Sequence, residues 1–452
     1  MPASWSGARL SMTSRPAMST DEMPSAAAAS SVASSAPAPR ELSSARALGA
    51  FNVGLLGYGT VGSAFAALLD ERAPHVERLT GRLPVLSGTL TTSRGRFPEI
   101  LERSEAIVEL IGGIEPARAH VLAALSAGKH VITANKQLLS SHGEELFEAA
   151  RASGAQLRFE AAVAGVVPVV RVLCESLAGA HVERVHGIVN GTTNFILSEM
   201  TRGSTYAQAL AEAQRLGFAE ADPSEDVTGR DAAAKMAILA RLAFNTPVHI
   251  DDVPYEGIEQ LKTDDIQYAR ELGLGLKLIG TAERRDGGLS VRVHPAFLYS
   301  GHPLASVNGP FNAVTVESEA ITEITMSGPG AGGRQTASAV LGDLVSAMLP
   351  PPAPSPPSDP LPLVQDIESG FYIHMEMADR PGALAAVAHV LGEQGASIKS
   401  VVQHGLGEHA RLVMVVHPLA ETRLREALTR IGALDFLRST PRAIRVIEEE
   451  FM

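Results

Sequence analysis

Three glycines, Gly57, Gly59 and Gly62, constrain the fold more than any other feature, because they stand between an apolar stretch and a helix-like one in FNVGLLGYGTVGSAFAALLDERA. At a strand-to-helix turn the first glycine permits the tight bend, the second lets a pyrophosphate approach, and the third allows close helix packing. The N–H groups of Thr60 and Val61, where the helix begins, would bind that phosphate. The pattern predicts a Rossmann-type dinucleotide site, with an ordinary glycine turn as the alternative.

The next expected strand, LPVLSGTLTTSRGRF, ends in basic rather than acidic residues. An Asp or Glu at this position would bind the ribose 2′-hydroxyl of NAD, whereas an arginine accommodates the 2′-phosphate of NADP. The chain carries Ser93, Arg94 and Arg96. We therefore expect NADP, with Arg94 as a ligand. A solvated basic loop would look the same, so NAD stays the alternative.

Strand-like and helix-like segments then alternate through AIVELIG, PARAHVLAALSAG, HVITAN, KQLLSSHGEELFEAARASG and AQLRFEAAVAG. Such alternation predicts parallel strands joined by right-handed crossovers. Ligands gather at the carboxyl ends of these strands, where Gly112 and Gly113 follow one strand and Lys136 follows the next. We expect Lys136 to lie where nicotinamide and substrate meet. A solvated lysine at a helix start is the alternative.

Residues 220–235, EADPSEDVTGRDAAAK, concentrate carboxylates around one amine. Pro223 and Gly229 predict a loop, and the alanine-rich stretch after them predicts a helix. Asp231 and Lys235 would share one helix face, and the neighbours of Lys235 are almost all apolar. Burial lowers the pKa of an ammonium and a nearby carboxylate raises it, so this setting suits a proton-transfer group. A surface ion pair is the alternative.

The pattern becomes mixed over residues 161–325, which predicts an α+β substrate and dimerisation domain after a nucleotide-binding domain over 49–160. The polar segment NGTTN would hold the polar atoms of an amino acid, or form a hairpin turn. GPGAGGRQTASAVLGDLV repeats the glycine-loop-to-helix arrangement, so we expect Gly332 to contact the cofactor. Residues 326–348 would then complete the first domain.

Three further segments complete the expected domain organisation. Residues 349–370 are proline-rich and predict a stiff linker. Residues 371–452 read strand, helix, strand, strand, helix, strand, which predicts a separate ferredoxin-like domain. At the other end, residues 1–48 are rich in Ala, Ser and Pro and predict a disordered tail.

Composition limits the functional classes. A net charge of -12 argues against nucleic acid and anionic membranes as partners, and the sequence has no apolar run long enough for a membrane span. The single cysteine, Cys174, excludes an internal disulfide and suits a reducing compartment. We expect a cytoplasmic α/β enzyme in which this thiol is buried as a small hydrophobe.

Taken together and in order, the motifs resemble those of homoserine dehydrogenase with a C-terminal ACT domain. They are GLLGYGTVG, ELIGGIEPA, TANK, FEAAVAG, GIVNGTTNFIL, EADPSEDVTGRDAAAK and GPGAGG. The resemblance covers about residues 51–348 and 371–448. It implies NAD(P)-linked interconversion of L-aspartate 4-semialdehyde and L-homoserine, on the route to threonine, methionine and isoleucine. The stretch before residue 51 is shorter than a kinase domain, so we expect no fused aspartate kinase.

The resemblance also implies roles for individual residues. Lys235 matches the family's proton donor, and Lys136 matches a lysine that contacts cofactor and substrate and could share the proton transfer or stabilise the oxyanion. Glu220 matches a ligand of the substrate amine, with Asp226 and Asp231 lining the same site.

A monovalent-cation site, typically for sodium, is implied as well. Glu160 matches it, together with the backbone carbonyls of Val163, Gly165 and Val167. The family commonly has a second glycine after Gly165, where this chain has Val166. Glycine fits strained backbone that valine adopts only at a cost, so the cation assignment has less support than that of the two lysines.

ACT domains resemble one another as amino-acid sensors that pair between subunits. The resemblance implies a homodimer or homotetramer inhibited by L-threonine, with the DRPG turn and Gln403 as contacts, or an ACT domain that serves oligomerisation alone. Two other classes stay open: a dehydrogenase resembling 3-phosphoglycerate dehydrogenase, which needs an Arg and a His–Glu pair, and an NADP-binding sensor. The sensor would not need the Asp231–Lys235 pair.

Overall fold

The computed structural model describes residues 49–285, 287–350, 360–405 and 409–447, which belong to one compact unit. The expected disordered tail and residues 351–359 of the proline-rich stretch lie outside these residues. No helix within them is long and apolar enough to cross a bilayer.

The first sheet is parallel throughout, in the order β2-β1-β3-β4-β5, which confirms the Rossmann-type domain. Its strands are β1 (Ala50–Leu56), β2 (Leu83–Leu90), β3 (Ala106–Glu109), β4 (His130–Thr133) and β5 (Leu157–Arg158). All four residues of β3 are buried, as expected for a central strand covered on both faces. The edge strand β5 is shorter than AQLRFEAAVAG suggested, because the chain turns at η1 (Glu160–Ala162) towards the second domain.

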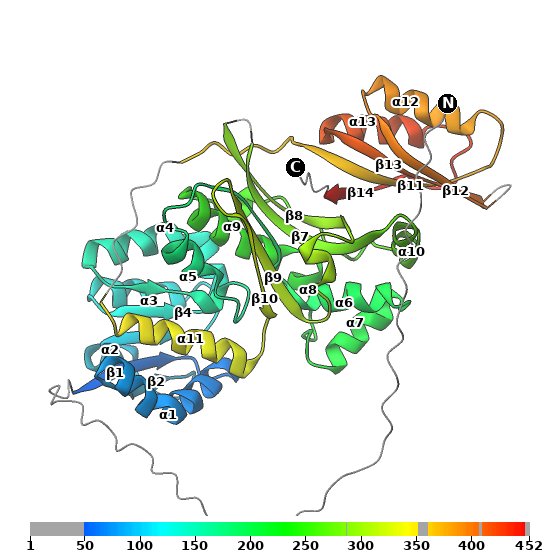
Figure 1. The fold of residues 1–452 in the computed structure, drawn as a ribbon. Coiled ribbons are helices and arrows are strands. Elements are labelled where there is room, and N and C mark those ends of the chain that lie inside the picture. The colour runs from blue at the N-terminus through cyan, green and yellow to red at the C-terminus, as the bar shows by residue number, and fades with distance from the viewer. Residues whose placement is uncertain (1–48, 286, 351–359, 406–408, 448–452) are drawn as a thin grey trace, which may run out of the picture. The chain divides into compact units, whose positions relative to one another are not determined.

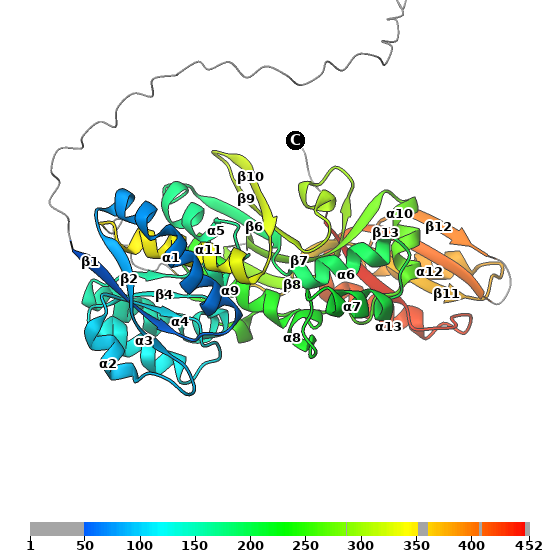
Figure 2. The ribbon, with the colours of Figure 1, turned by 90° about the horizontal axis from the view of Figure 1, so that it is seen from below.

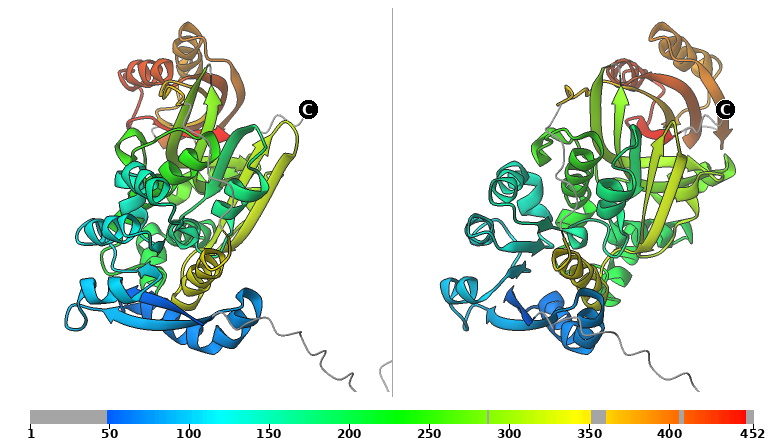
Figure 3. Two further views of the ribbon diagram at one scale, coloured as in Figure 1. Left: turned by 90° about the vertical axis from the view of Figure 1, so that its left-hand side faces the viewer. Right: turned by 60° about the vertical axis from the view of Figure 1, so that its left-hand side comes forward.

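Helices cover both faces of this sheet. They are α1 (Thr60–Thr80), α2 (Phe97–Arg103), α3 (Ala117–Ser126), α4 (Lys136–Ser153) and α11 (Gly333–Ala347). Although α11 lies far along the chain, it packs against α1, and the yellow α11 lies beside the blue α1 in both views of Figure 3. Their buried apolar residues form one core cluster with β1. The chain therefore returns to the first domain after the second sheet.

The second domain is built on antiparallel strands in the order β10-β9-β6-β7-β8. They are β6 (Val182–Ile188), β7 (Leu274–Arg285), β8 (Gly288–Tyr299), β9 (Phe311–Ser318) and β10 (Thr322–Pro329). The associated helices are α5 (Val169–Arg171), η2 (Val172–Ser176), α6 (Gly191–Thr201), α7 (Tyr206–Arg215), α8 (Ser224–Val227), α9 (Arg230–Phe244), η3 (Ile250–Asp252), α10 (Thr263–Glu271) and η4 (Pro303–Ser306).

Helix α9 lies at the junction of the two domains. It packs on β7 and β8 from one side and against α4 from the other (Figures 1 and 2). Ten of its residues are buried, most of them alanine, leucine, isoleucine or methionine. Polar side chains on such a helix are therefore held among apolar neighbours.

The last elements are β11 (Glu368–Met377), α12 (Ala383–Glu393), β12 (Ile398–His404), β13 (Ala410–Ala420), α13 (Glu421–Gly432) and β14 (Arg442–Ile447). Their strand order, β14-β11-β13-β12, confirms the ferredoxin-like domain. Its strand β14 also pairs in parallel with β8, with Ile447 opposite Leu298. The ferredoxin-like sheet thus continues the sheet of the second domain, which the sequence did not predict.

The expectation for Cys174 is wrong, because this side chain is exposed. It lies in the π-helical turn Val172–Ser176. Leu173 in this turn and Leu177 directly after it are buried, whereas the cysteine is exposed.

Candidate active site

The first glycine loop has the geometry that a bound pyrophosphate requires. Gly57 has φ +97°, and a Cβ there would lie 2.4 Å from the carbonyl oxygen of Leu110. A Cβ on Gly62 would lie 2.2 Å from the carbonyl oxygen of Gly57, whereas Gly59 faces open space. No side chain caps the start of α1, so the N–H groups of its first turn are free to bind an anion. These residues fit a dinucleotide.

The second glycine loop lies beside the first. Gly332, with φ +144°, immediately precedes α11. A Cβ on the next residue, Gly333, would lie 3.1 Å from Cγ2 of Thr60, at the start of α1. Two glycine loops from opposite ends of the catalytic part therefore meet where the phosphate is expected.

The end of β2 also reaches this loop, because the N–H of Gly57 donates to the carbonyl oxygen of Leu90 at 2.9 Å. Of the two arginines that follow, Arg96 pairs with Glu99 at 2.9 Å. Arg94 is exposed and makes no side-chain hydrogen bond or ion pair within the described ranges. Its guanidinium is thus free to bind a ligand.

Lys136 is fixed by a buried network that the sequence analysis missed. The Glu109 carboxylate accepts hydrogen bonds from two backbone N–H groups of the loop after β3, at 2.7 and 3.2 Å, and from Oγ1 of Thr133 at 2.6 Å. Asn135 caps α4 and donates to the carbonyl oxygen of Gly113 at 2.6 Å. Together these hydrogen bonds hold the carboxyl ends of β3 and β4 together, next to Lys136. The signal was present in the sequence, since both polar residues stand at strand ends in ELIGG and TANK.

Asp231 joins both predicted lysines. Its Oδ2 accepts from Nζ of Lys235 at 2.7 Å and its Oδ1 lies 2.9 Å from Nζ of Lys136. Asn190 donates through Nδ2 to Asp231 at 2.8 Å and to Asp226 at 2.7 Å. The second bond of Lys235 goes to the carbonyl oxygen of Val189 at 2.9 Å. Two lysines, two carboxylates and one carboxamide are therefore assembled at the junction of the domains.

Asn190 has a different structural role from the one expected of NGTTN. The segment forms neither an isolated polar loop nor a hairpin turn, because Asn190 is the N-cap of α6 and accepts from the backbone N–H of Thr193 at 2.8 Å. Asparagine is a preferred N-cap residue, so the sequence carried this signal. The cap leaves the Nδ2 group of Asn190 free to bridge the two carboxylates.

The charges in this cluster perturb one another. Burial alone would raise the pKa of Asp231, but the ammonium groups of Lys235 and Lys136 outweigh it and hold that pKa well below its usual range. Asp231 in turn raises the pKa of Lys136, against the effect of burial. Burial, with the charge of Asp231, raises the pKa of Asp226. Asp231 is therefore a fixed anion and Lys136 a fixed cation, and Asp226 is the carboxylate that more readily takes a proton.

Glu220 is not drawn into this cluster. It is exposed, and its side chain has no polar contact with any described residue. Glu225, five residues on, instead accepts from Nε2 of Gln137 at 3.0 and 3.1 Å, next to Lys136. This contact also escaped the sequence analysis, because it joins segments that are distant in the chain.

At the expected cation site, the Glu160 carboxylate is already engaged, because it accepts from the N–H groups of Val170 and Arg171 at 2.8 and 2.9 Å. This leaves backbone carbonyls, such as those of Val163 and Gly165, as the candidate ligands. Val167 follows in the same loop, and its carbonyl oxygen accepts from the N–H of Val169 at 2.8 Å.

Val166 does not carry the left-handed backbone of this loop. Left-handed backbone falls instead on Ala164, with φ +55°, and Gly165, with φ +69°. A Cβ on Gly165 would lie 2.3 Å from the carbonyl oxygen of Gly330. Val166 therefore lies outside the left-handed part of the loop.

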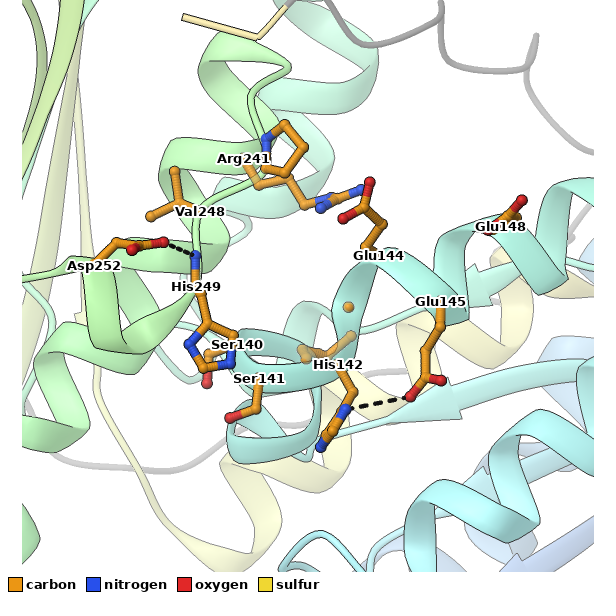
Figure 4. A pocket seen from close by; sticks show the side chains of 13 residues that line it. Ser140, Ser141, His142, Glu144, Glu145, Glu148, Arg241, Val248, His249 and Asp252 are labelled. Atoms are coloured by element: carbon orange, nitrogen blue, oxygen red, sulfur yellow. Dashed lines mark hydrogen bonds and ion pairs between the residues drawn. The ribbon is translucent and has the colours of Figure 1, made fainter. Parts of the chain in front are cut away.

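One cavity adjoins the cluster, and a second, larger cavity also borders α4. The first, of about 170 Å³, contains Lys136, Gln137, Glu225 and Arg230. The second, of about 500 Å³, lies between α4 and the segment after α9 and is lined by residues that include His142, Glu144, Arg241 and His249 (Figure 4). None of the predicted catalytic residues lines this larger cavity, so we do not place the reaction there.

Fold and site together define the class: an NAD(P)-dependent dehydrogenase that joins a Rossmann-type domain and a lysine–carboxylate centre to a C-terminal ferredoxin-like domain. Family models agree along the chain. Residues 57–160 match the NAD-binding domain of homoserine dehydrogenase, residues 168–345 match homoserine dehydrogenase, and residues 371–436 match the ACT domain.

The chain belongs to the homoserine dehydrogenase family. It is 42% identical to homoserine dehydrogenase of Corynebacterium glutamicum over 88% of this chain and 96% of that one. It is 43% identical to the Mycobacterium tuberculosis enzyme over 87% and 97%. The crystal structure of a homoserine dehydrogenase from Thiobacillus denitrificans matches with TM-score 0.84 and 36% identity, over 88% of this chain and 98% of that one. The resemblance and the enzyme class expected from the sequence are confirmed.

A more distant match bears on the cofactor. A hyperthermophilic archaeal homoserine dehydrogenase mutant in complex with NADPH superposes with TM-score 0.58 and 28% identity, over 67% of this chain and 98% of that one.

Proposed function

We propose that the chain interconverts L-aspartate 4-semialdehyde and L-homoserine with a nicotinamide cofactor, in the cytoplasm. The observation that carries this proposal is the pair of ammonium groups held on one buried carboxylate, Lys235 at 2.7 Å and Lys136 at 2.9 Å from Asp231. The names of its relatives support the same reaction. A carbonyl that is being reduced develops negative charge on oxygen, and this centre supplies both a proton and a positive charge.

The two lysines have different roles in this proposal. Bound nicotinamide supplies the hydride in the reducing direction. Lys235, whose side chain is 14% exposed, donates the proton to the alkoxide oxygen and takes it back in the oxidising direction. Lys136 stabilises the oxyanion as a permanent cation, because Asp231 raises its pKa. Asp231 orients both amines at once.

We assign the substrate's ammonium group to Glu220, with Asp226 and Asp231 lining the same site. The support for Glu220 is that its carboxylate is exposed and unpaired among the described residues. An amino-acid substrate carries a positive charge that needs such a partner.

NADP is the proposed cofactor over NAD. Gly57, Gly59, Thr60, Val61, Gly62 and Gly332 would hold its phosphates, and Arg94 would hold its 2′-phosphate. Support comes from the open first turn of α1 and the unpaired guanidinium of Arg94. The archaeal relative in complex with NADPH is consistent with this choice. We further propose a monovalent cation, sodium, at the backbone carbonyls of the segment 163–167, with Glu160 as the residue that shapes it.

Regulation is the third part of the proposal. The ACT domain binds L-threonine as an inhibitor at the DRPG turn, and the enzyme is a homodimer or homotetramer. The match to the ACT domain supports this proposal. A hydrogen bond also joins the two expected contacts, since Gln403 donates to Asp379, the first residue of the turn, at 2.9 Å. Domain boundaries at 49–160 with 326–348, 161–325, 349–370 and 371–452 complete this assignment.

One assay tests the reaction and the cofactor together. NADPH or NADH is mixed with the enzyme and L-aspartate 4-semialdehyde, and the loss of nicotinamide absorbance is followed with and without threonine. We expect consumption that depends on the aldehyde and is faster with NADPH. No consumption with either cofactor would refute the proposed function.

A further inference from the structure

A third lysine, which is buried, lies outside the cluster described above. Lys277, on β7, is 4% exposed. Its Nζ donates to Oδ1 of Asn194 and to Oδ1 of Asn308, each at 3.1 Å, and to the carbonyl oxygen of Val307. Three acceptors satisfy all three N–H groups of an ammonium.

No carboxylate pairs with Lys277 among the described residues, and burial lowers its pKa to about 8. A buried ammonium without a carboxylate partner is costly to desolvate, and three neutral acceptors satisfy its donors without supplying an opposite charge. Packing alone therefore gives no reason for a lysine here. The reason lies in the groups that its ammonium holds together.

Those groups belong to α6 and to the segment that leads into β9. Asn194 also donates through Nδ2 to the carbonyl oxygens of Val307 and Phe311, at 3.2 and 3.1 Å. The segment also lies close to the first residue of α6, because a Cβ on Gly191 would lie 2.8 Å from the carbonyl oxygen of Pro310. Lys277 thus fastens the segment 307–311 against the first turn of α6.

The first turn of α6 begins at the residue that aligns the catalytic carboxylates. Asn194 donates its backbone N–H to the carbonyl oxygen of Asn190 at 3.3 Å, and the Asn190 side chain bridges Asp226 and Asp231. The same segment also receives the N–H of Gly330, from the second glycine loop, on the carbonyl oxygen of Pro310 at 3.2 Å.

We propose that Lys277 is a positioning residue of the dehydrogenase reaction: its ammonium fixes the start of α6 through Asn194, and so holds Asn190 on the carboxylate that orients the proton donor. This inference rests on the proposed function. It requires no contact between Lys277 and substrate or cofactor.

The first test compares Lys277→Met with Lys262→Met, which removes an exposed lysine near the start of α10. We expect Lys277→Met to lower kcat about tenfold or more, with the Kd for NADPH, measured by fluorescence titration, within about twofold of the parent. Lys262→Met should change neither. A folded Lys277→Met enzyme with normal kcat would overturn the inference, even if its Tm falls.

A double-mutant cycle tests the route through Asn190. If Lys277 acts through that side chain, Asn190→Ala combined with Lys277→Met should have a kcat within about threefold of the worse single variant. If the loss of kcat in the double variant equals the product of the losses in the two single variants, the inference is overturned.

Chemical rescue covers the case in which the methionine variant folds poorly. In Lys277→Ala, ammonium chloride should raise kcat at least about threefold, and tetramethylammonium chloride of equal ionic strength should not, because it donates no hydrogen bond. Equal effects of the two salts would overturn the inference. The parent enzyme and Lys235→Ala separate the claims: without activity in the parent the proposed function fails, if Lys235→Ala keeps its kcat the proton-donor role fails, and if only Lys277→Met keeps its kcat only this inference fails.

Discussion

The carboxylate of Asp231 accepts a hydrogen bond from the ammonium of Lys235 at 2.7 Å, one turn apart on α9. The other oxygen of that carboxylate lies 2.9 Å from the ammonium of Lys136, which begins α4. One buried anion therefore connects a helix of the first domain with a helix of the second. The packing of α4 against α9 and the placement of the two amines depend on each other.

Removing the charge of this carboxylate should disrupt both the chemistry and the fold. In Asp231→Asn two ammonium groups lose their shared partner, and breaking a buried ion pair costs on the order of 3 kcal/mol. We expect the free energy of urea unfolding to fall by about that amount and kcat to fall about a hundredfold. Asp222→Asn, which changes an exposed carboxylate in the same segment, is the matched control and should alter neither. A variant with parental stability and turnover would show that Asp231 is not the organising anion.

Cofactor preference should depend on one of two neighbouring arginines. Arg94 is unpaired within the described residues, whereas Arg96 is engaged with Glu99. Because a hydrogen bond to a charged group is worth about 1.5–3 kcal/mol, Arg94→Gln should raise the KM for NADPH about tenfold or more and leave the KM for NADH unchanged. Arg96→Gln should leave both unchanged. Equal losses with the two cofactors would mean that Arg94 does not read the 2′-phosphate.

Stability should depend on pH through Asp343, a buried residue of α11. Its Oδ2 accepts from the N–H of Glu160 at 2.7 Å, yet burial raises its pKa to about 7. A raised carboxyl pKa means that the folded state binds the proton more tightly than the unfolded state. Protonated Asp343 therefore stabilises the fold fully below pH 3.8, the pKa of the unfolded state. This stabilisation is lost as the pH rises to about 7, by about 1.4 kcal/mol for each pH unit between these two values.

The measurement is the free energy of unfolding between pH 4 and 7 for the parent and for Asp343→Asn, which cannot titrate. We expect the parent to lose a few kcal/mol relative to the variant across this range. Parallel curves for the two proteins would show that Asp343 ionises normally in the fold.

Local sequence patterns predicted those structural features that depend only on residues close together in the chain. The turn at Gly57 followed from glycine spacing, and the contact between Asp231 and Lys235 followed from helical periodicity. The contact between Lys136 and Asp231 could not be predicted in this way, because it depends on how α4 packs against α9. Asn190 was assigned to a polar turn, although it caps a helix and bridges two carboxylates.

Long-range strand pairing was also beyond the sequence. The ferredoxin-like order of residues 371–452 was correct, but nothing in either strand indicated that β14 would pair with β8. Lys277 escaped notice for a related reason. A single lysine in an apolar strand has no local partner, and its three acceptors come from segments that only the fold brings together.

The most direct test of the central claim is the kcat of Lys235→Ala, measured beside the Kd of the same variant for NADPH. Loss of a general acid lowers turnover by on the order of a hundredfold or more, and Lys235 contacts Asp231 and Val189 rather than the glycine loop. We therefore predict that kcat falls by at least that factor while the Kd hardly moves. Near-normal turnover would contradict the assignment of Lys235 as the proton donor.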